Sequence, residues 1–281
     1  MEKIVTGYGL IEGPLWIEGR GLLFSDVQNG GVYALGTDGL VSTVLEHRKG
    51  IGGMSAHRDG GIIVGGRNIA YKGLGADDRS LVLLDKDVTD TAIGFNDFTT
   101  DSQGRLWVGS LGYVVFSDQT PRPGHLHVID LDGSVRTVSD GIMLTNGLAF
   151  SPDGTKLYHS DARENIVRVY DVTDGDVGPW KTFAAYEDGH PDGLCVAADG
   201  AIVVAVAHGS RVDVYEPDGS LRQSLPCPLP MVTSVAFGGD DLGDLYVVTG
   251  SVGGPDALSG TVFRTGIGVS GLPVPLCQVS I

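Results

Sequence analysis

The stretch NGLAFSPDGTKLYHSDARENIVRVYD, residues 146–171, contains three short runs of strand-forming residues separated by two polar turns. Apolar residues recur in these runs with the two-residue period of a strand that buries one face. The first turn, residues 151–154, combines Ser, Pro, Asp and Gly, which favour tight reverse turns. The stretch therefore predicts three antiparallel strands joined by hairpins.

The same hairpin recurs along the whole chain. Six polar turns, 41 to 50 residues apart, each open a short apolar strand, and their glycines are Gly19, Gly60, Gly104, Gly154, Gly200 and Gly243. A period in the forties with several strands per unit is typical of a β-propeller. We therefore predict an all-β, six-bladed propeller with four-stranded antiparallel blades around a central channel, formed by residues 1–281 as one domain. Pairing of residues 3–6 with residues 261–265 would close the ring and remove free sheet edges.

Composition restricts the partners of this chain. The formal net charge is −16 and the pI is near 4.6, which argues against binding to nucleic acid or to an anionic membrane. The first thirty residues lack a signal-peptide pattern, and no apolar run approaches membrane-spanning length. Three cysteines match no zinc or redox spacing. We expect a cytoplasmic protein with reduced thiols that acts on a small-molecule substrate.

Four oxygen-bearing side chains occupy nearly the same phase of the repeat. Glu12, Asn96, Asn146 and Asp192 each lie seven or eight residues before a turn glycine. Each turn would follow the innermost strand of a blade, so these residues would meet at one mouth of the channel. Two carboxylates and two amide carbonyls are ligands for a hard divalent cation. The pattern predicts one such ion, Ca²⁺ first, with Mg²⁺, Mn²⁺ and Zn²⁺ as alternatives.

A cation held this way would keep open positions for water or a substrate oxygen. It would polarise a carbonyl group and lower the pKa of a bound water. Asp192 is the candidate base, because its loop places a carboxylate at the edge of the site. His190, His208 and His159 are candidate substrate contacts. The segment 111–124 carries aromatics and prolines and is either a lid over the site or a plain connection.

The residues around these positions give the chain a family resemblance. The matching segments are EGPLW (12–16), FND (95–97), TNGLAFS (145–151), PDGL (191–194), VTSVAFGG (232–239) and GTVFR (260–264). The chain resembles the SMP-30/gluconolactonase/luciferin-regenerating-enzyme family of six-bladed propellers. The resemblance implies a divalent metal bound by Glu12, Asn146 and Asp192, with Asn96 as a metal ligand or a substrate contact. It also implies lactone hydrolysis, in which Asp192 assists the attack of water.

One departure from the family concerns the substrate. Sugar lactonases of this family often carry Arg two residues before the first Asn, and this chain has Gly94 there. Loss of that guanidinium favours a less polar or bulkier lactone or ester. Two other interpretations stay open: the same metal site used for a non-hydrolytic, isomerase-like or lyase-like carbonyl reaction, and a non-catalytic binding propeller stabilised by its metal. The sequence leaves the metal, the lactone and the oligomeric state open.

Overall fold

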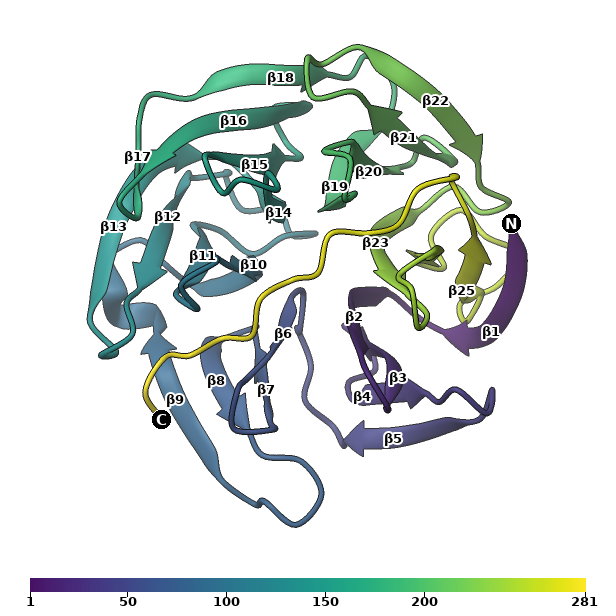
Figure 1. Ribbon diagram of the computed structural model, residues 1–281, viewed down its shortest axis with the longest axis horizontal. Helices are drawn as coiled ribbons and strands as arrows, with labels where there is room; N and C mark the ends of the chain where they lie inside the picture. The colour runs from purple at the N-terminus through teal and green to yellow at the C-terminus, as the bar shows by residue number, and fades with distance from the viewer.

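The computed structural model describes residues 1–281 as six antiparallel sheets arranged in a ring (Figure 1). Each sheet is one blade, and its innermost strand lies next to the central channel. Only one helical turn is present, the 3-10 helix η1 (Lys86–Val88). The prediction of an all-β, six-bladed propeller is confirmed.

The blades follow one another along the chain. From the channel outward, the first three blades consist of β2 (Ile11–Ile17), β3 (Gly21–Asp26), β4 (Val32–Leu35) and β5 (Val41–Leu45); β6 (Met54–Ala56), β7 (Ile62–Val64), β8 (Asn68–Lys72) and β9 (Ser80–Asp85); and β10 (Gly94–Thr100), β11 (Leu106–Leu111), β12 (Gly124–Ile129) and β13 (Val135–Ile142).

The second half of the ring repeats this order. The fourth and fifth blades are β14 (Thr145–Phe150), β15 (Lys156–Asp161), β16 (Ile166–Thr173) and β18 (Lys181–Ala185); and β19 (His190–Val196), β20 (Ile202–Ala207), β21 (Arg211–Tyr215) and β22 (Leu221–Pro226). The short strand β17 (Asp176–Val177) adds a second pairing to β16, so the fourth blade has five strands. The sixth blade is β23 (Val232–Gly238), β24 (Asp244–Thr249), β25 (Gly260–Thr265) and β1 (Glu2–Tyr8).

The two ends of the chain close the ring inside this sixth blade. Strand β1 pairs antiparallel with β25, with Lys3 opposite Phe263 and Thr6 opposite Thr261. The predicted closure is therefore confirmed, and it covers the edge that β25 would otherwise expose. No helix is long and apolar enough to cross a membrane.

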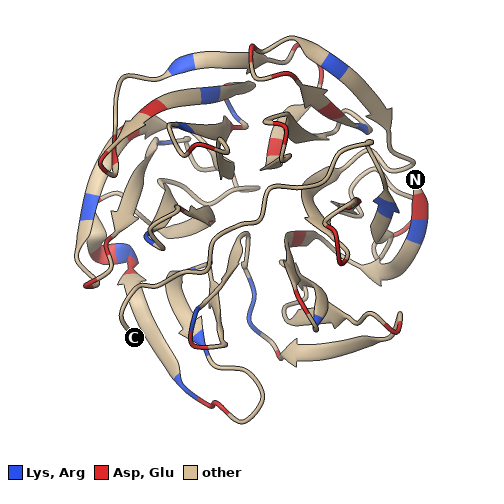
Figure 2. Cartoon of the chain, in the orientation of Figure 1, with Lys and Arg blue, Asp and Glu red and all other residues tan.

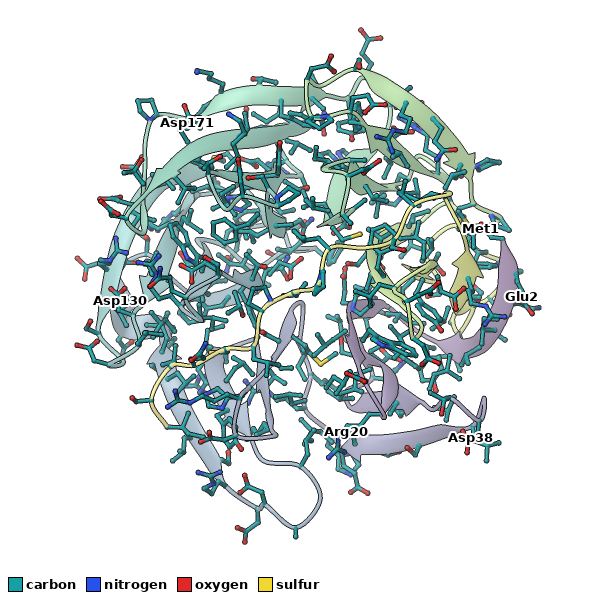
Figure 3. All side chains as sticks on the ribbon, viewed as in Figure 1. Met1, Glu2, Arg20, Asp38, Asp130 and Asp171 are labelled. Atoms are coloured by element: carbon teal, nitrogen blue, oxygen red, sulfur yellow. The ribbon has the colours of Figure 1, made fainter.

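The core is divided into clusters between neighbouring blades. Strands in the middle of a blade are buried on both faces, as in β20, whose six residues are all buried. One cluster joins valines of β20 and β21 to Phe237 and Leu245 of the next blade. Acidic and basic residues lie mostly on turns and outer strands (Figure 2), and the labelled Glu2, Asp38, Asp130 and Asp171 are at the rim (Figure 3).

The C-terminal segment, residues 270–281, adds a feature that the sequence did not suggest. It runs across the middle of the ring (Figure 1). It bonds to the last residues of two innermost strands: Leu272 N donates to Val196 O of β19, and Cys277 N donates to Ala56 O of β6, at 2.9 and 2.8 Å. Cys277 and Val279 are fully buried between the second and third blades. The segment therefore crosses the channel at the end opposite the predicted metal ligands.

Candidate functional site

A shared backbone irregularity places the four predicted site residues. Near its start, each of the strands β2, β10, β14 and β19 contains one residue more than its partner strand, within residues 12–15, 95–98, 145–148 and 191–194. Such a β-bulge re-aims the side chains beside it. Strand β6 pairs with β7 without a bulge and supplies no predicted ligand. Strand β23 of the sixth blade also has one extra residue near its start, within residues 232–234, so the bulge is shared by the four blades with predicted ligands but is not confined to them.

The two asparagines are in direct contact across the boundary between the third and fourth blades. Asn96 Nδ2 donates to Asn146 Oδ1 at 2.5 Å and to the Thr145 carbonyl oxygen at 2.7 Å. These bonds use the Asn96 amide group as a donor and leave its Oδ1 directed toward Gly52 of the second blade. A Cβ atom at Gly52 would lie 2.1 Å from that Oδ1. Glycine is therefore required at this phase of the second blade.

Glu12 is held at the first bulge by its neighbours. Ser25 Oγ lies 3.1 Å from the Glu12 carbonyl oxygen and 2.7 Å from the carbonyl oxygen of Ile51, so the serine links the first two blades at this point. Gly13, next in sequence, has φ +55° and would bring a Cβ atom within 2.9 Å of Gly52 O. Close backbone packing fixes the direction of the Glu12 carboxylate.

Three carboxyl groups at this end of the channel have raised pKa values, with burial as the largest cause in each. Burial, and then the charges of Asp192 and Asp97, raise the pKa of Glu12 well above its usual range. Burial and the charge of Asp97 do the same to the pKa of Asp192, which is 6% exposed. Burial raises the pKa of Asp97 to about 7. No Lys or Arg compensates any of the three groups.

Asp97 is a site residue that the repeat pattern did not single out, although it follows Asn96 directly in the FND segment. Its Oδ1 accepts a hydrogen bond from Phe98 N at 3.1 Å, and a Cβ atom at Gly53 would lie 2.6 Å from it. The side chain lines the channel below the asparagines. The available signal was an acid directly after a predicted ligand; because both lie in a β-bulge, strand alternation does not tell which way the Asp97 side chain points.

The donor set fits a hard cation better than a soft one. No group of three or more His, Cys, Asp or Glu side chains converges as a metal cluster. The predicted set needs only two carboxylates, because Asn146 and Asn96 would supply amide oxygens. A half-buried and a buried carboxyl group, Glu12 and Asp192, without a basic partner are the environment that a divalent cation neutralises. The residues present therefore fit Ca²⁺, Mg²⁺ or Mn²⁺.

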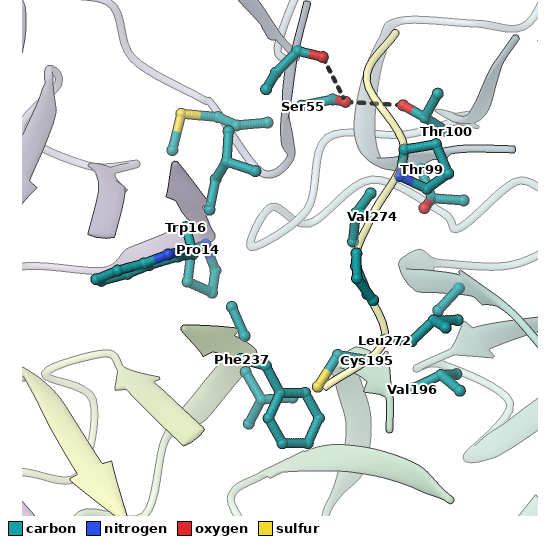
Figure 4. Close-up of a pocket in the computed structure, with 18 of the residues that line it drawn as sticks. Pro14, Trp16, Ser55, Thr99, Thr100, Cys195, Val196, Phe237, Leu272 and Val274 are labelled. Carbon is teal, nitrogen blue, oxygen red and sulfur yellow. Dashed lines mark hydrogen bonds between the residues drawn. The ribbon is translucent and has the colours of Figure 1, made fainter. Parts of the chain in front are cut away.

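The channel below the site holds a cavity of about 600 Å³. Its upper end is lined by Gly13, Asp97 and Ser234, and the C-terminal segment closes its lower end. Figure 4 shows Pro14 and Trp16 on one side and Val274 on the other. The wall is largely apolar, apart from such groups as Ser55 and Thr100, whose hydroxyl oxygens are 2.8 Å apart. None of the four phased residues lines this cavity.

The candidate histidines differ in their surroundings. His190 is exposed at the start of β19, with Nδ1 2.6 Å from Asn165 Oδ1, and its ring is 6.0 Å from that of His208. Both therefore lie on the face that carries Asp192. His159 is fully buried inside the fourth blade, so it has no surface to offer a substrate, and that expectation is wrong.

The segment 111–124 joins β11 to β12, and Leu111 pairs with Gly94. It therefore begins on the same face as Asn96. Tyr113 is buried, with the Arg163 guanidinium 6.0 Å above its ring, whereas Phe116 is 79% exposed. The segment leans on the next blade through Tyr113, and its action as a lid stays a prediction.

Comparison with known proteins identifies the family. The sequence model of the SMP-30/Gluconolactonase/LRE-like region matches residues 10–251. The chain belongs to this family.

Relatives within the SMP-30/gluconolactonase/LRE-like family match over nearly the whole chain. A 6-deoxy-6-sulfogluconolactonase from Pseudomonas putida is 33% identical, covering 94% of each chain. The pentonolactonase XacC of Haloferax volcanii is 30% identical, covering 95% of this chain and 94% of its own. Among solved structures, a luciferin-regenerating enzyme superposes with a TM-score of 0.88 at 26% identity, covering 100% of this chain and 99% of that one.

Proposed function

We propose that this protein is a metal-dependent lactonase that opens a small lactone, or a related ester, by addition of water. The observation that carries the proposal is the pair of carboxyl groups of half-buried Glu12 and buried Asp192, which lack a basic partner and share one end of the channel with Asn96 and Asn146. The two lactonases at 30% identity or more, each matched over almost its full length, support the reaction class.

In this proposal Glu12, Asn146 and Asp192 hold one divalent cation, with Ca²⁺ as the first choice. The cation supplies Lewis-acid polarisation of the lactone carbonyl and lowers the pKa of a bound water. Asn96 donates to Asn146 and so fixes the orientation of the amide whose oxygen faces the ion. Its own Oδ1, on the side of Gly52, accepts no hydrogen bond within the protein and is available to the cation or to a substrate hydroxyl group.

Asp192 has the second task of moving a proton. The oxygen of water adds to the carbonyl carbon while one water proton passes to the Asp192 carboxylate. The bond from that carbon to the ring oxygen then breaks, and the departing oxygen takes a proton to give the hydroxy acid. Low exposure of Asp192 favours this role, because a buried carboxylate holds a proton more readily than a solvated one.

The test combines metal loading with matched variants. Chelation of the purified protein should abolish hydrolysis of a lactone panel, and added Ca²⁺ should restore it. Asp192→Asn should lower kcat by about 10²- to 10⁴-fold, the usual contribution of a general base. Asp38→Asn, a change at the rim of the ring, should leave kcat unchanged (Figure 3). Full activity of the verified metal-free protein would refute the proposal.

Two other functions make different predictions from the same metal site. An isomerase-like or lyase-like reaction would give a product without the mass of one added water, which mass spectrometry of the product detects. A purely structural cation would raise the melting temperature without turnover of any carbonyl substrate.

A further inference from the structure

We propose that Arg67 supplies an anion-binding subsite beside Asn96, so that the preferred substrate is a lactone bearing an additional carboxylate or phosphate group. This inference rests on the proposed lactonase function and names the substrate class of the same site. Arg67 belongs to the hairpin between β7 and β8 of the second blade, whereas Asn96 belongs to the third. The subsite would therefore be shared between two blades.

The position of Arg67 is fixed by backbone bonds between these blades. Phe95 N donates to Gly66 O at 2.7 Å, and Gly66 N donates to Phe95 O at 3.1 Å. A Cβ atom built on Gly94 would lie 3.7 Å from the Arg67 Cα atom and 3.0 Å from Gly66 O. A side chain at position 94 and the side chain of Arg67 would thus start from the same place on the surface.

That place is within reach of the candidate site. Gly94 precedes Asn96 by two residues of strand, about 7 Å at the usual rise, a separation that an extended arginine side chain covers. The missing arginine at Gly94 suggested a substrate of low polarity. We infer a more polar substrate, because the neighbouring blade carries an arginine whose Cα atom lies 3.7 Å from the place of a Cβ atom at position 94.

The charge state of Arg67 favours a ligand from solution. Arg67 is exposed and forms no ion pair, in a protein of net charge −16 whose other arginines are frequently paired with carboxylates, such as Arg105, Arg211 and Arg222. A guanidinium recognises carboxylate and phosphate through two parallel hydrogen bonds. An unpaired arginine beside an acidic site is suited to a substrate anion.

A second arginine keeps the hairpin in place and leaves Arg67 free. Arg48 Nη2 donates to Gly65 O at 2.9 Å, to Asn68 O at 3.0 Å and to Asn68 Oδ1 at 2.9 Å. These bonds bracket Gly66 and Arg67 on both sides. The backbone that presents Arg67 is therefore anchored, which lowers the entropic cost of binding an anion there.

Binding of sugar acids tests the subsite without turnover. The Ca²⁺-loaded protein should bind D-glucarate, with two carboxylates, at least about ten-fold more tightly than D-gluconate, with one, in isothermal titration calorimetry. Arg67→Ala should remove most of that preference, because a charge-assisted hydrogen-bond pair is worth about ten- to hundred-fold in affinity. An unchanged ratio of the two affinities in Arg67→Ala would overturn the proposal.

Two control variants, one at an arginine and one at a lysine, separate this contact from net charge. Arg20→Ala removes an exposed, unpaired charge at a turn on the opposite end of the ring. Lys49→Ala removes a charge on the same face, but the Lys49 side chain runs toward the first blade, with Cγ 3.2 Å from a Cβ built on Gly30. Neither control should change the glucarate preference by more than about two-fold, as expected for surface charges without a direct contact.

The double variant Arg67→Ala/Gly94→Arg gives a test of position. It returns a guanidinium to the same place from the third blade, so the glucarate preference should recover at least in part. No recovery, with the fold intact by circular dichroism, would contradict a subsite at this place.

Hydrolysis separates the subsite from the lactonase function. Arg67→Ala should raise KM for D-glucaro-1,4-lactone and leave KM for D-glucono-1,5-lactone unchanged. If Arg67→Ala hydrolyses each lactone as efficiently as the wild type does, the subsite is refuted and the lactonase function is not. Absence of any hydrolysis, with the binding preference retained, refutes the lactonase function alone.

Discussion

Asp97→Asn should stabilise the metal-free protein. The carboxyl group of Asp97 has a pKa of about 7 in the folded protein, against an ordinary value of 3.8, and burial is the main cause. The difference of about 3 pH units corresponds to about 4 kcal/mol, at about 1.4 kcal/mol for each unit. The amide keeps the shape of the side chain and removes the charge. The free energy of unfolding should therefore rise by at most about 4 kcal/mol where the wild-type group is ionised.

The pH dependence of this effect has a definite sign. A carboxyl group whose pKa is raised on folding binds its proton more tightly in the folded state, so its contribution to stability falls as pH rises. Below pH 3.8 the group is protonated in both states and its charge costs nothing. Between pH 3.8 and about 7 the cost increases, and above about 7 it is complete. The advantage of Asp97→Asn should thus be full at pH 8 and small at pH 4.

Urea denaturation of metal-free protein at pH 8 and pH 4 measures both effects. Asp38→Asn is the matched control, because this aspartate lies at the exposed rim and should change stability by no more than about 0.5 kcal/mol. If Asp97→Asn is no more stable than the wild type at pH 8, the Asp97 carboxylate is not destabilised by burial. The electrostatic account of the site would then be wrong.

Two further predictions concern packing around the channel. Gly193→Ala should cost about 1–3 kcal/mol in urea denaturation, because its Cβ atom would lie 2.0 Å from Ser234 Oγ, whereas Gly178→Ala, where the nearest atom is 3.8 Å away, should be close to neutral. Deletion of residues 270–281 should lower the melting temperature and speed maleimide labelling of Cys195, which lines the cavity that this segment closes; unchanged labelling in a folded deletion variant would show that the segment does not control access.

The fold could be predicted because its signals are local. Every turn that follows an innermost strand carries Gly, in five of the six with Asp or Ser close by, and the spacing of these turns counts the blades directly. Closure of the ring could be predicted because each end of the chain has one strand-like segment without a hairpin partner. Strand β1 does pair with β25. An all-β fold could also be predicted locally, because no long segment shows the apolar period of a helix.

The C-terminal segment shows where local signals stop. Residues 270–281 alternate small, apolar and proline residues without a hairpin partner, and their contacts are with turns far away in sequence. Leu272 bonds to the fifth blade, Cys277 to the second and Ser280 to Leu131 of the third. Such contacts depend on the finished ring, so no pattern within the segment could reveal them.

The absence of a polar ligand in the second blade has a physical cause that the sequence alone could not supply. A Cβ atom at Gly52 would collide with the oxygen of Asn96, so a side chain there would displace the asparagine that contacts Asn146. The same close packing occurs further round the ring at Gly193, the residue after Asp192. A Cβ atom there would collide with Ser234, so only glycine leaves room for that serine. The polar residues at this end of the channel and the glycines beside them, Gly52 and Gly193, therefore form one packing arrangement: a side chain added at either glycine would move a polar group of the neighbouring blade.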